Sequence, residues 1–229
     1  MISTIIVAAG NSTRMNMGKS KQYIPINNIP VLARSIKTFE SISLIDEIIV
    51  VVNQSDINYC KEKIIGPQNF CKIKSIVAGG NNRQQSVFNG IKEASSSSDI
   101  IVIHDGARPF VKSDTIKKTI DTAKENSSAT CAVRVKDTIK ISSKENFVTK
   151  TIPREFLWSI QTPQAFKKDI IVESHQKAIS DQFLGTDDTA LVERLGIKTK
   201  IVEGDYFNIK ITTKEDLTFA DAILNPSFN

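Results

Sequence analysis

Five runs of apolar residues divide the first part of the chain into repeating units. They cover residues 4–8, 47–53, 73–78, 99–105 and 129–135, and polar or turn-forming residues bound each of them. Apolar runs of this length without alternation are typical of strands that are buried on both faces of a parallel sheet. We therefore predict five strands of a mostly parallel sheet.

Helical patterns lie between these runs. Leu32, Ile36 and Phe39 share one helical face after Pro30, which suits a first turn. The same spacing predicts further helices over residues 56–65, through Ile91 to about residue 94, and after a Ser113 cap along Ile116, Ile120 and Ala123. Strand and helix in alternation favour right-handed crossovers. Residues 1–229 should form a single Rossmann-like α/β domain, a twisted and mostly parallel sheet flanked by helices.

The alternation breaks at residues 136–158. Two β-like pieces, residues 137–141 and 147–152, flank the turn-forming stretch 142–146. This pattern predicts a β-hairpin that projects from the domain as an arm. After the arm we expect helices near residues 169–179 and 187–195, a strand at 198–202, the segment 207–211, and a final helix with Leu217, Ala220 and Leu224 on one side.

Composition narrows the class of protein. A chain of 229 residues that is 40% hydrophobic can bury one large core. The three cysteines form no CxxC pair, which argues against a disulfide framework or a zinc site and fits a cytoplasmic location. No apolar run is long enough to span a membrane.

The positive charge is dispersed along the chain. The net charge is +5, with basic doublets instead of a basic block, and aromatic residues are only 7% and scattered. This distribution fits small anionic substrates better than nucleic acid. A non-catalytic nucleic-acid-binding module remains a remote alternative.

The loop after the first strand has the features of a polyphosphate site. Ala8, Ala9 and Gly10 are small enough for the backbone to approach a ligand, and Arg14 and Lys21 add positive charge. The P-loop pattern would need glycine at Thr13, and the dinucleotide pattern GxGxxG would need glycines at positions 12 and 15. The loop is therefore a different kind of phosphate site, or an ordinary surface loop.

Seven motifs in order resemble one family over nearly the whole chain. They are Ala8-Ala9-Gly10 with Arg14-Met15 and Lys21-Gln22-Tyr23; Gly79-Gly80 with Arg83 and Ser86; residues 104–110, HDGARPF; Asp137-Thr138; Thr162-Pro163-Gln164; Thr186-Asp187-Asp188; and residues 208–212, NIKIT. The family is 2-C-methyl-D-erythritol 4-phosphate cytidylyltransferase, of the non-mevalonate isoprenoid pathway. The resemblance implies an enzyme that joins CTP and methylerythritol phosphate, releases pyrophosphate and uses a divalent metal, usually Mg²⁺.

The resemblance also implies roles for single residues. Arg14, Lys21 and Lys210 would hold the phosphates during catalysis. The CTP site would comprise Ala8, Ala9, Gly10, Gly80, Ser86 and Asp105. Asp105 would also be a metal ligand, with the metal held mainly by triphosphate oxygens. Because the phosphate of the acceptor is already a nucleophile at neutral pH, no general base is needed.

The acceptor site implied by the resemblance involves two subunits. Its residues would be Asp105, Arg108, Thr138, Arg154, Thr162 and Thr186. In the family the arm reaches into the neighbouring subunit, so Thr138 and Arg154 would serve the partner of a homodimer. A related ribitol 5-phosphate cytidylyltransferase would differ only at the acceptor end, and it stays an alternative.

Simpler interpretations stand beside these roles. Asp105 could be a turn residue, Arg108 an ion-pair partner and Lys210 a solvated strand end. Thr138 and Thr162 would more often be plain strand or turn threonines. Asp187 and Asp188 suit the start of a helix, His104 is predicted to be structural, and His175 to lie on a helix surface.

Two positions depart from the family pattern. Asn81 stands where many relatives carry an acid, and Pro153 precedes Arg154 where an aspartate is common. Proline fixes its own backbone and lacks an N–H donor, so it affects the path of the arm.

Overall fold

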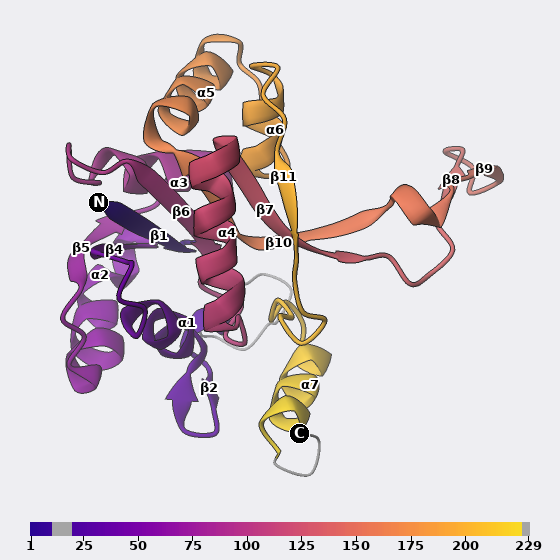
Figure 1. Cartoon of the computed structure of the whole chain (residues 1–229). Helices are drawn as coiled ribbons and strands as arrows, with labels where there is room; N and C mark the ends of the chain where they lie inside the picture. Colours follow the sequence, from indigo (N-terminus) through magenta and orange to yellow (C-terminus); the bar gives the residue numbers. More distant parts are fainter. Residues whose placement is uncertain (11–19, 226–229) are drawn as a thin grey trace.

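The computed structural model describes residues 1–10 and 20–225 (Figure 1). Within these residues a seven-stranded sheet has the order β11-β7-β10-β6-β1-β4-β5. The strands are β1 (Ile2–Ala8), β4 (Glu47–Val52), β5 (Ile73–Ala78), β6 (Ile100–Asp105), β7 (Ser128–Arg134), β10 (Trp158–Lys167) and β11 (Lys200–Glu203). Every strand pairs in parallel with its neighbours except β10, which is antiparallel to β6 and β7. The prediction of a mostly parallel sheet is confirmed.

Helices cover both faces of this sheet (Figure 1). On one face, α1 (Val31–Glu40) and α4 (Ser113–Asn126) pack on side chains such as Ile6 and Val50. On the other, α3 (Arg83–Lys92), α5 (Lys168–Ser180) and α6 (Asp188–Glu193) pack on Ile5 and Val51. Because successive strand residues point to opposite faces, one continuous apolar run supplies both cores.

The carboxyl ends of the parallel strands carry the smaller elements. A short hairpin of β2 (Pro25–Ile26) and β3 (Ile29–Pro30) precedes α1. The last helix, α7 (Lys214–Leu224), packs beside it in a separate cluster with Ile26, Ile211 and Ala220. The final helix was predicted with Ala220 on its inner side, and that prediction is confirmed.

Several local predictions are wrong or incomplete. Residues 56–65 form a three-residue α2 (Ile57–Tyr59) followed by a π-helical turn, Cys60–Ile65, and not one regular helix. Lys112 occupies the N-cap of α4, and Ser113 is its first helical residue with no capping hydrogen bond. Residues 207–211 lie in neither a helix nor a strand. The strand β10 was not predicted.

The arm is present as predicted. Strands β8 (Lys140–Ser142) and β9 (Val148–Thr151) pair in an antiparallel hairpin that projects from the body of the protein (Figure 1). Its two strands are exposed along their whole length, and Phe147 beside them is 74% exposed. Ile141 and Val148 on the hairpin are exposed as well.

None of the helices in the described ranges is long and apolar enough to cross a membrane.

A buried carboxylate links β1, β4 and β5 near the edge where these strands begin. Glu47 accepts hydrogen bonds from Ser3 Oγ at 2.6 Å and from Ser95 N and Oγ at 2.8 and 2.6 Å, and Lys74 Nζ lies 3.2 Å away. Burial disfavours its charge, but the hydrogen bonds and Lys74 prevail and lower the pKa of Glu47 to about 2. The ionised form is therefore the one that stabilises the fold.

Replacing this carboxylate should weaken the fold in a pH-dependent way. At pH 7, Glu47→Gln is expected to lower the free energy of unfolding by about 1–3 kcal/mol, because buried donors lose a charged acceptor. The folded pKa of about 2 lies below the ordinary 4.5, so the contribution is complete above pH 4.5 and fades as the pH falls toward 2. Denaturant unfolding from pH 7 to 3 checks this, with exposed Glu62→Gln as control. A difference that is independent of pH would contradict it.

Candidate active site

Two adjoining cavities lie at the carboxyl edge of the sheet. The first, of about 530 Å³, is lined by residues of two loops: the opening loop, which follows β1, and the paired-glycine loop, which follows β5 and contains Gly79 and Gly80. Its lining includes Ala8, Ala9, Gly10, Lys21, Gly80 and Ser86. The second, of about 440 Å³, is lined by Arg108, Thr162 and Thr186 among others. Arg83, Asp105 and Lys210 line both cavities. These three side chains form the boundary at which groups from the two cavities meet.

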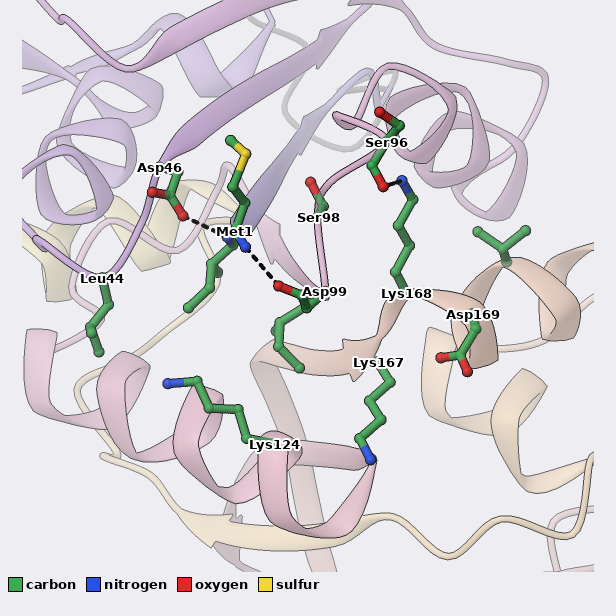
Figure 2. A pocket seen from close by; sticks show the side chains of 13 residues that line it. Met1, Leu44, Asp46, Ser96, Ser98, Asp99, Lys124, Lys167, Lys168 and Asp169 are labelled. Carbon is green, nitrogen blue, oxygen red and sulfur yellow. Dashed lines mark hydrogen bonds and ion pairs between the residues drawn. The ribbon is translucent and has the colours of Figure 1, made fainter.

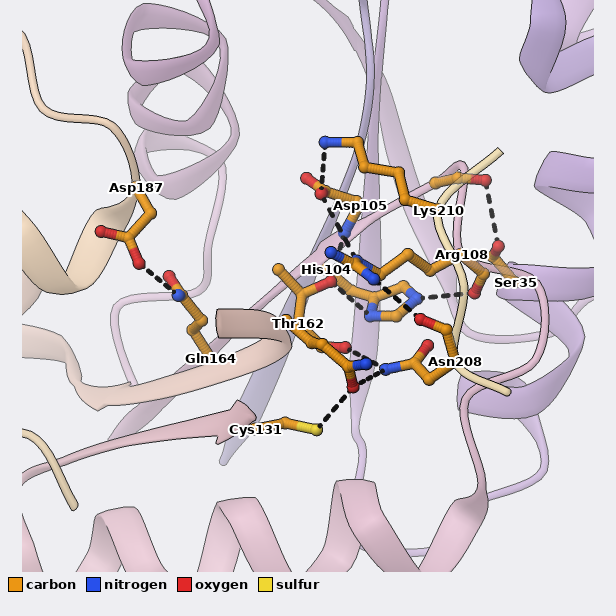
Figure 3. A network of polar contacts seen from close by, with 12 residues as sticks. Ser35, His104, Asp105, Arg108, Cys131, Thr162, Gln164, Asp187, Asn208 and Lys210 are labelled. Carbon is orange, nitrogen blue, oxygen red and sulfur yellow. Dashed lines mark hydrogen bonds and ion pairs between the residues drawn. The ribbon is translucent and has the colours of Figure 1, made fainter. Parts of the chain in front are cut away.

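Asp105 is the centre of this boundary (Figure 3). It ends β6, opposite Val7 of β1. Its Oδ2 lies 2.7 Å from Lys210 Nζ and 3.8 Å from Arg108 Nε, and its Oδ1 lies 3.2 Å from Arg83 Nε. Burial alone would raise its pKa, but Arg83, Lys210 and Arg108 outweigh burial and hold the pKa of Asp105 well below its usual range. Asp105 is therefore an ionised carboxylate surrounded by cations.

The turn after Asp105 requires glycine. Gly106 N donates to Val7 O at 2.8 Å, and Ser35 Oγ donates to Gly106 O at 3.0 Å. A Cβ at residue 106 would lie 2.9 Å from Leu32 Cδ1. The same Cβ would lie 3.1 Å from Ala8 Cβ and 3.2 Å from Val7 O, which have little freedom to move, so glycine suits the close turn of β6 past β1.

Arg83 connects Asp105 to a second buried acid. The first residue of α3, it donates from Nη1 to Asp188 Oδ2 at 2.7 Å. Burial would lower the pKa of Arg83, but the two carboxylates raise it. His175 is also fully buried, with Nε2 3.3 Å from Asp188 Oδ1 and its ring stacked on Phe88. The prediction that His175 lies on the surface is wrong.

Helix α6 begins at the pair of acids that were predicted to start a helix. Asp187 is the N-cap and accepts a hydrogen bond from Ala190 N at 3.0 Å, and Asp188 is the first helical residue. Thr186 precedes them and lines the second cavity. The prediction of a helix start is confirmed, and Asp188 in addition binds Arg83.

A buried histidine contacts two residues that line the second cavity. His104 is fully buried, and burial lowers its pKa to about 4, so the ring is neutral. Its Nδ1 lies 3.1 Å from Thr162 Oγ1 and its Nε2 3.0 Å from Arg108 O. Arg108 Nη1 in turn donates to Asn208 O at 2.7 Å. The expectation that His104 is structural agrees with this position.

The paired glycines bring α3 close to the opening loop. A Cβ at Gly79 would lie 2.3 Å from Ala9 Cβ, so only glycine fits there. Ser86 Oγ accepts from Gly80 N at 3.0 Å and donates to Asn82 O at 2.8 Å. The Ser86 hydroxyl thus shapes the loop that lines the first cavity.

The opening loop is fixed where it returns to the domain. Gln22 Nε2 donates to Ala8 O at 2.7 Å, and Lys21 begins a short 3-10 turn, Lys21–Tyr23. This places Lys21 in the lining of the first cavity, together with Asn81, the residue that departs from the family pattern. The predicted catalytic residue Arg14 lies outside the described residues.

Two predicted acceptor residues lie outside these cavities in the same chain. Thr138 and Arg154 belong to the arm, which leads away from the sheet (Figure 1). Arg154 Nη1 donates to the carbonyl of Lys136. The remaining described residues of the predicted site line one or both cavities.

Sequence reasoning missed several residues of the site. Arg83 stood in a quoted motif without a role, although a cation beside paired glycines was a usable signal. Asn208 is buried and donates to Gln161 Oε1 at 3.0 Å and Thr162 O at 2.9 Å. Gln164 donates to Asp187 Oδ2 at 2.8 Å (Figure 3). Gln161 and Gln164 belong to β10, whose polar sequence gave no strand signal.

The donor set is compatible with a metal that binds mainly to substrate. Within the described ranges, no three His, Cys, Asp or Glu side chains gather as a metal site. Asp105 is the carboxylate among the described lining of the first cavity. Magnesium commonly binds one or two carboxylates together with substrate phosphates. Asp105 is the residue of this lining that would hold such an ion.

A larger hollow, of about 960 Å³, lies at the opposite edge of the sheet (Figure 2). Its charged lining includes Lys124, Lys167, Lys168, Asp46, Asp99 and Asp169. The ammonium group of Met1 lies 2.7 Å from Asp99 Oδ2. Since positive and negative groups are mixed there, this hollow does not have the cationic character that a triphosphate requires.

Comparisons with known proteins give one consistent result. Residues 2–226 match the family model described as 2-C-methyl-D-erythritol 4-phosphate cytidylyltransferase. A relative of that name from Caldanaerobacter subterraneus subsp. tengcongensis is 49% identical, with 97% of this chain and 98% of the relative covered. Another from Clostridium acetobutylicum is 47% identical, with 98% and 97% covered. The crystal structure of 4-diphosphocytidyl-2C-methyl-D-erythritol synthase from Anaerococcus prevotii superposes with a TM-score of 0.87 at 37% identity, covering 97% of this chain and 95% of that one.

Proposed function

The chain belongs to the 2-C-methyl-D-erythritol 4-phosphate cytidylyltransferase family, and on this basis we propose how its two cavities carry out the reaction. The enzyme joins CTP and 2-C-methyl-D-erythritol 4-phosphate to give 4-diphosphocytidyl-2-C-methyl-D-erythritol and pyrophosphate, a step of non-mevalonate isoprenoid precursor biosynthesis. CTP occupies the first cavity and the acceptor the second. The observation that carries this assignment is the shared boundary of Arg83, Asp105 and Lys210.

The reaction is a nucleotidyl transfer by in-line displacement. A phosphate oxygen of the acceptor forms a bond to the α-phosphorus of CTP, and the bond from that phosphorus to the oxygen of the leaving pyrophosphate breaks. Since an ionised phosphate needs no deprotonation, catalysis consists of positioning and of stabilising negative charge. The neutral, buried His104 is consistent with chemistry that needs no general base.

The cations have separate tasks in this scheme. Lys21 lines the first cavity and stabilises the α-phosphate, aided by Arg14. Lys210 lies at the boundary, where it orients the attacking phosphate toward the α-phosphorus. Its ion pair with Asp105 keeps the amine at this position before substrates bind.

The first cavity suits the nucleoside of CTP. Ala8, Ala9 and Gly10 leave the backbone open to the nucleotide, and Gly80 and Ser86 form the wall that we assign to cytosine and ribose. Backbone groups in this narrow loop would bind the edge of a pyrimidine and leave no room for a purine.

We propose Mg²⁺ as the cofactor. Asp105 would hold it together with oxygens of the triphosphate, in keeping with the donor set described above. When bound, the ion would neutralise negative charge on the phosphates that leave as pyrophosphate.

The arm completes the acceptor site of a second subunit in this proposal. Thr138 and Arg154 lie on it, and its exposed apolar side chains Phe147 and Val148 are suited to contact another copy of the chain. The guanidinium of Arg154 presents a rigid fork that fits a phosphate. The functional unit is then a homodimer with exchanged arms.

A cytoplasmic location belongs to the proposal as well. Cys60, Cys71 and Cys131 are all unpaired, as is usual in a reducing compartment. The nucleic-acid-binding alternative is not favoured, because the chain belongs to an enzyme family.

The acceptor and nucleotide can be tested together. Pyrophosphate release is expected with CTP and 2-C-methyl-D-erythritol 4-phosphate, and far less with ribitol 5-phosphate or with ATP or GTP. The family model and relatives carry the methylerythritol name, so the ribitol alternative is not favoured. A preference for ribitol 5-phosphate would overturn the acceptor assignment, and equal use of ATP would overturn the base assignment.

Lys21 is expected to dominate the chemical step. Lys21→Ala should reduce turnover by roughly 10²–10³-fold, the usual cost of losing one donor to the transition state. Lys124→Ala, in the hollow at the opposite edge, should keep the normal rate and serves as the control. Near-normal turnover in Lys21→Ala would remove this residue from its role.

Exchange of arms can be tested by complementation. Lys21→Ala and Arg154→Ala proteins should each be nearly inactive, while their heterodimer contains one intact site and should recover roughly half the normal activity per dimer, as symmetry requires. Differently tagged subunits verify the heterodimer. No recovery in purified heterodimers would show that each site is built from one chain.

A further inference from the structure

His104 contacts two residues of the acceptor cavity and takes no part in the mechanism above. It precedes Asp105 in β6, and its ring is fully buried. The two ring nitrogens face the carbonyl of Arg108 and the hydroxyl of Thr162, at 3.0 and 3.1 Å (Figure 3). The chemistry of these two partners fixes where the protons lie.

A carbonyl oxygen can only accept a hydrogen bond, so Nε2 carries a proton. The ring is fully buried and its nitrogens bond a carbonyl and a hydroxyl instead of a carboxylate, so this is its single proton. Nδ1 is then an acceptor, and the Thr162 hydroxyl donates its proton to it. The same hydroxyl oxygen accepts the backbone N–H of Asp105 at 3.0 Å. The only proton of the Thr162 hydroxyl is therefore used inside the protein, and its oxygen retains one acceptor position.

We propose that His104 is a positioning residue that fixes the polarity of the Thr162 hydroxyl, so that Thr162 accepts a hydrogen bond from a hydroxyl group of the acceptor polyol. This inference rests on the proposed function of the second cavity. A phosphate ionised at neutral pH offers mainly acceptors and would oppose the lone pairs of Thr162, whereas a substrate hydroxyl supplies the donor that Thr162 lacks.

The other polar groups of the second cavity are also separated, with donors on one side of Thr162 and acceptors on the other. Arg83, Arg108 and Lys210 supply donors at the edge shared with the CTP cavity, and the buried Nε of Arg108 makes no hydrogen bond to the described residues. Gln164 and Asp187 lie on the other side of Thr162 (Figure 3). The buried Oε1 of Gln164 accepts no hydrogen bond from the described residues. A polyol phosphate thus finds donors for its phosphate and acceptors for its hydroxyls.

Substrates that lack single hydroxyls test this polarity. Each free hydroxyl of 2-C-methyl-D-erythritol 4-phosphate is replaced by hydrogen in turn, and kcat/KM is measured for each analogue. One analogue should lose about tenfold with the wild-type enzyme, the size of one hydrogen bond. Thr162→Val should abolish that loss for the same analogue, and Thr162→Ser, which keeps the hydroxyl, should retain it.

Two substitutions of His104 separate positioning from mere packing. The side-chain oxygen of His104→Asn takes the place of Nδ1 and still accepts from Thr162. The amide nitrogen of His104→Gln takes the place of Nε2 and still donates to Arg108, but Thr162 loses its acceptor. Discrimination against the same analogue should persist in His104→Asn and disappear in His104→Gln. Equal discrimination in both variants would overturn the inference.

Thermal unfolding and the KM for CTP show whether each variant is folded. If neither His104 variant folds, the Thr162 pair decides, and full discrimination in Thr162→Val would overturn the inference. Failure of the proposed function has a different signature, because wild-type enzyme would then not convert the intact acceptor at all.

Discussion

The ionised carboxylate of Asp105, held among Arg83, Lys210 and Arg108, is the interaction on which the rest of the site depends. A buried charge is costly unless opposite charges compensate it, and several cations repel one another unless an anion lies between them. Asp105 therefore allows cationic side chains to gather at the boundary of two cavities. Substrate phosphates can then bind to cations that are already in place, which limits reorganisation during the reaction.

The fold brings these groups together from distant parts of the chain. Asp105 ends β6, Arg83 begins α3 on one face of the sheet, and Lys210 comes from the segment before α7. The parallel register of β1 and β6 places the carboxyl end of β1 beside Asp105. Open α/β sheets commonly bind ligands at the carboxyl ends of their strands, where loops from several crossovers converge. Here that edge supplies two cavities, which we assign to the nucleotide and to the acceptor.

Hydrogen bonds fix the positions of residues around the acceptor cavity in a way that charge alone would not. His104 joins Arg108 to Thr162, and Thr162 holds the backbone of Asp105, so the cationic edge and the hydroxyl site share one rigid support. A neutral ring suits this position, because a charged imidazole would add repulsion beside Arg108 and Lys210. Nucleotidyl transfer to an ionised phosphate depends on such placement more than on proton transfer.

The sequence by itself determined the parallel strands, most of the helices between them, the projecting hairpin and the family. Continuous apolar runs indicate strands that are buried on both faces of a sheet. Asp105 ends one such run, so the sequence placed it at a ligand-binding edge. The tertiary structure decided what depends on partners far along the chain. Strand β10 has a polar sequence because β6, β7 and the site satisfy its side chains, so periodicity could not reveal it. His175 is buried because Asp188 and Phe88 surround it, and Arg83 acquires its role only where two acids from separate elements meet it.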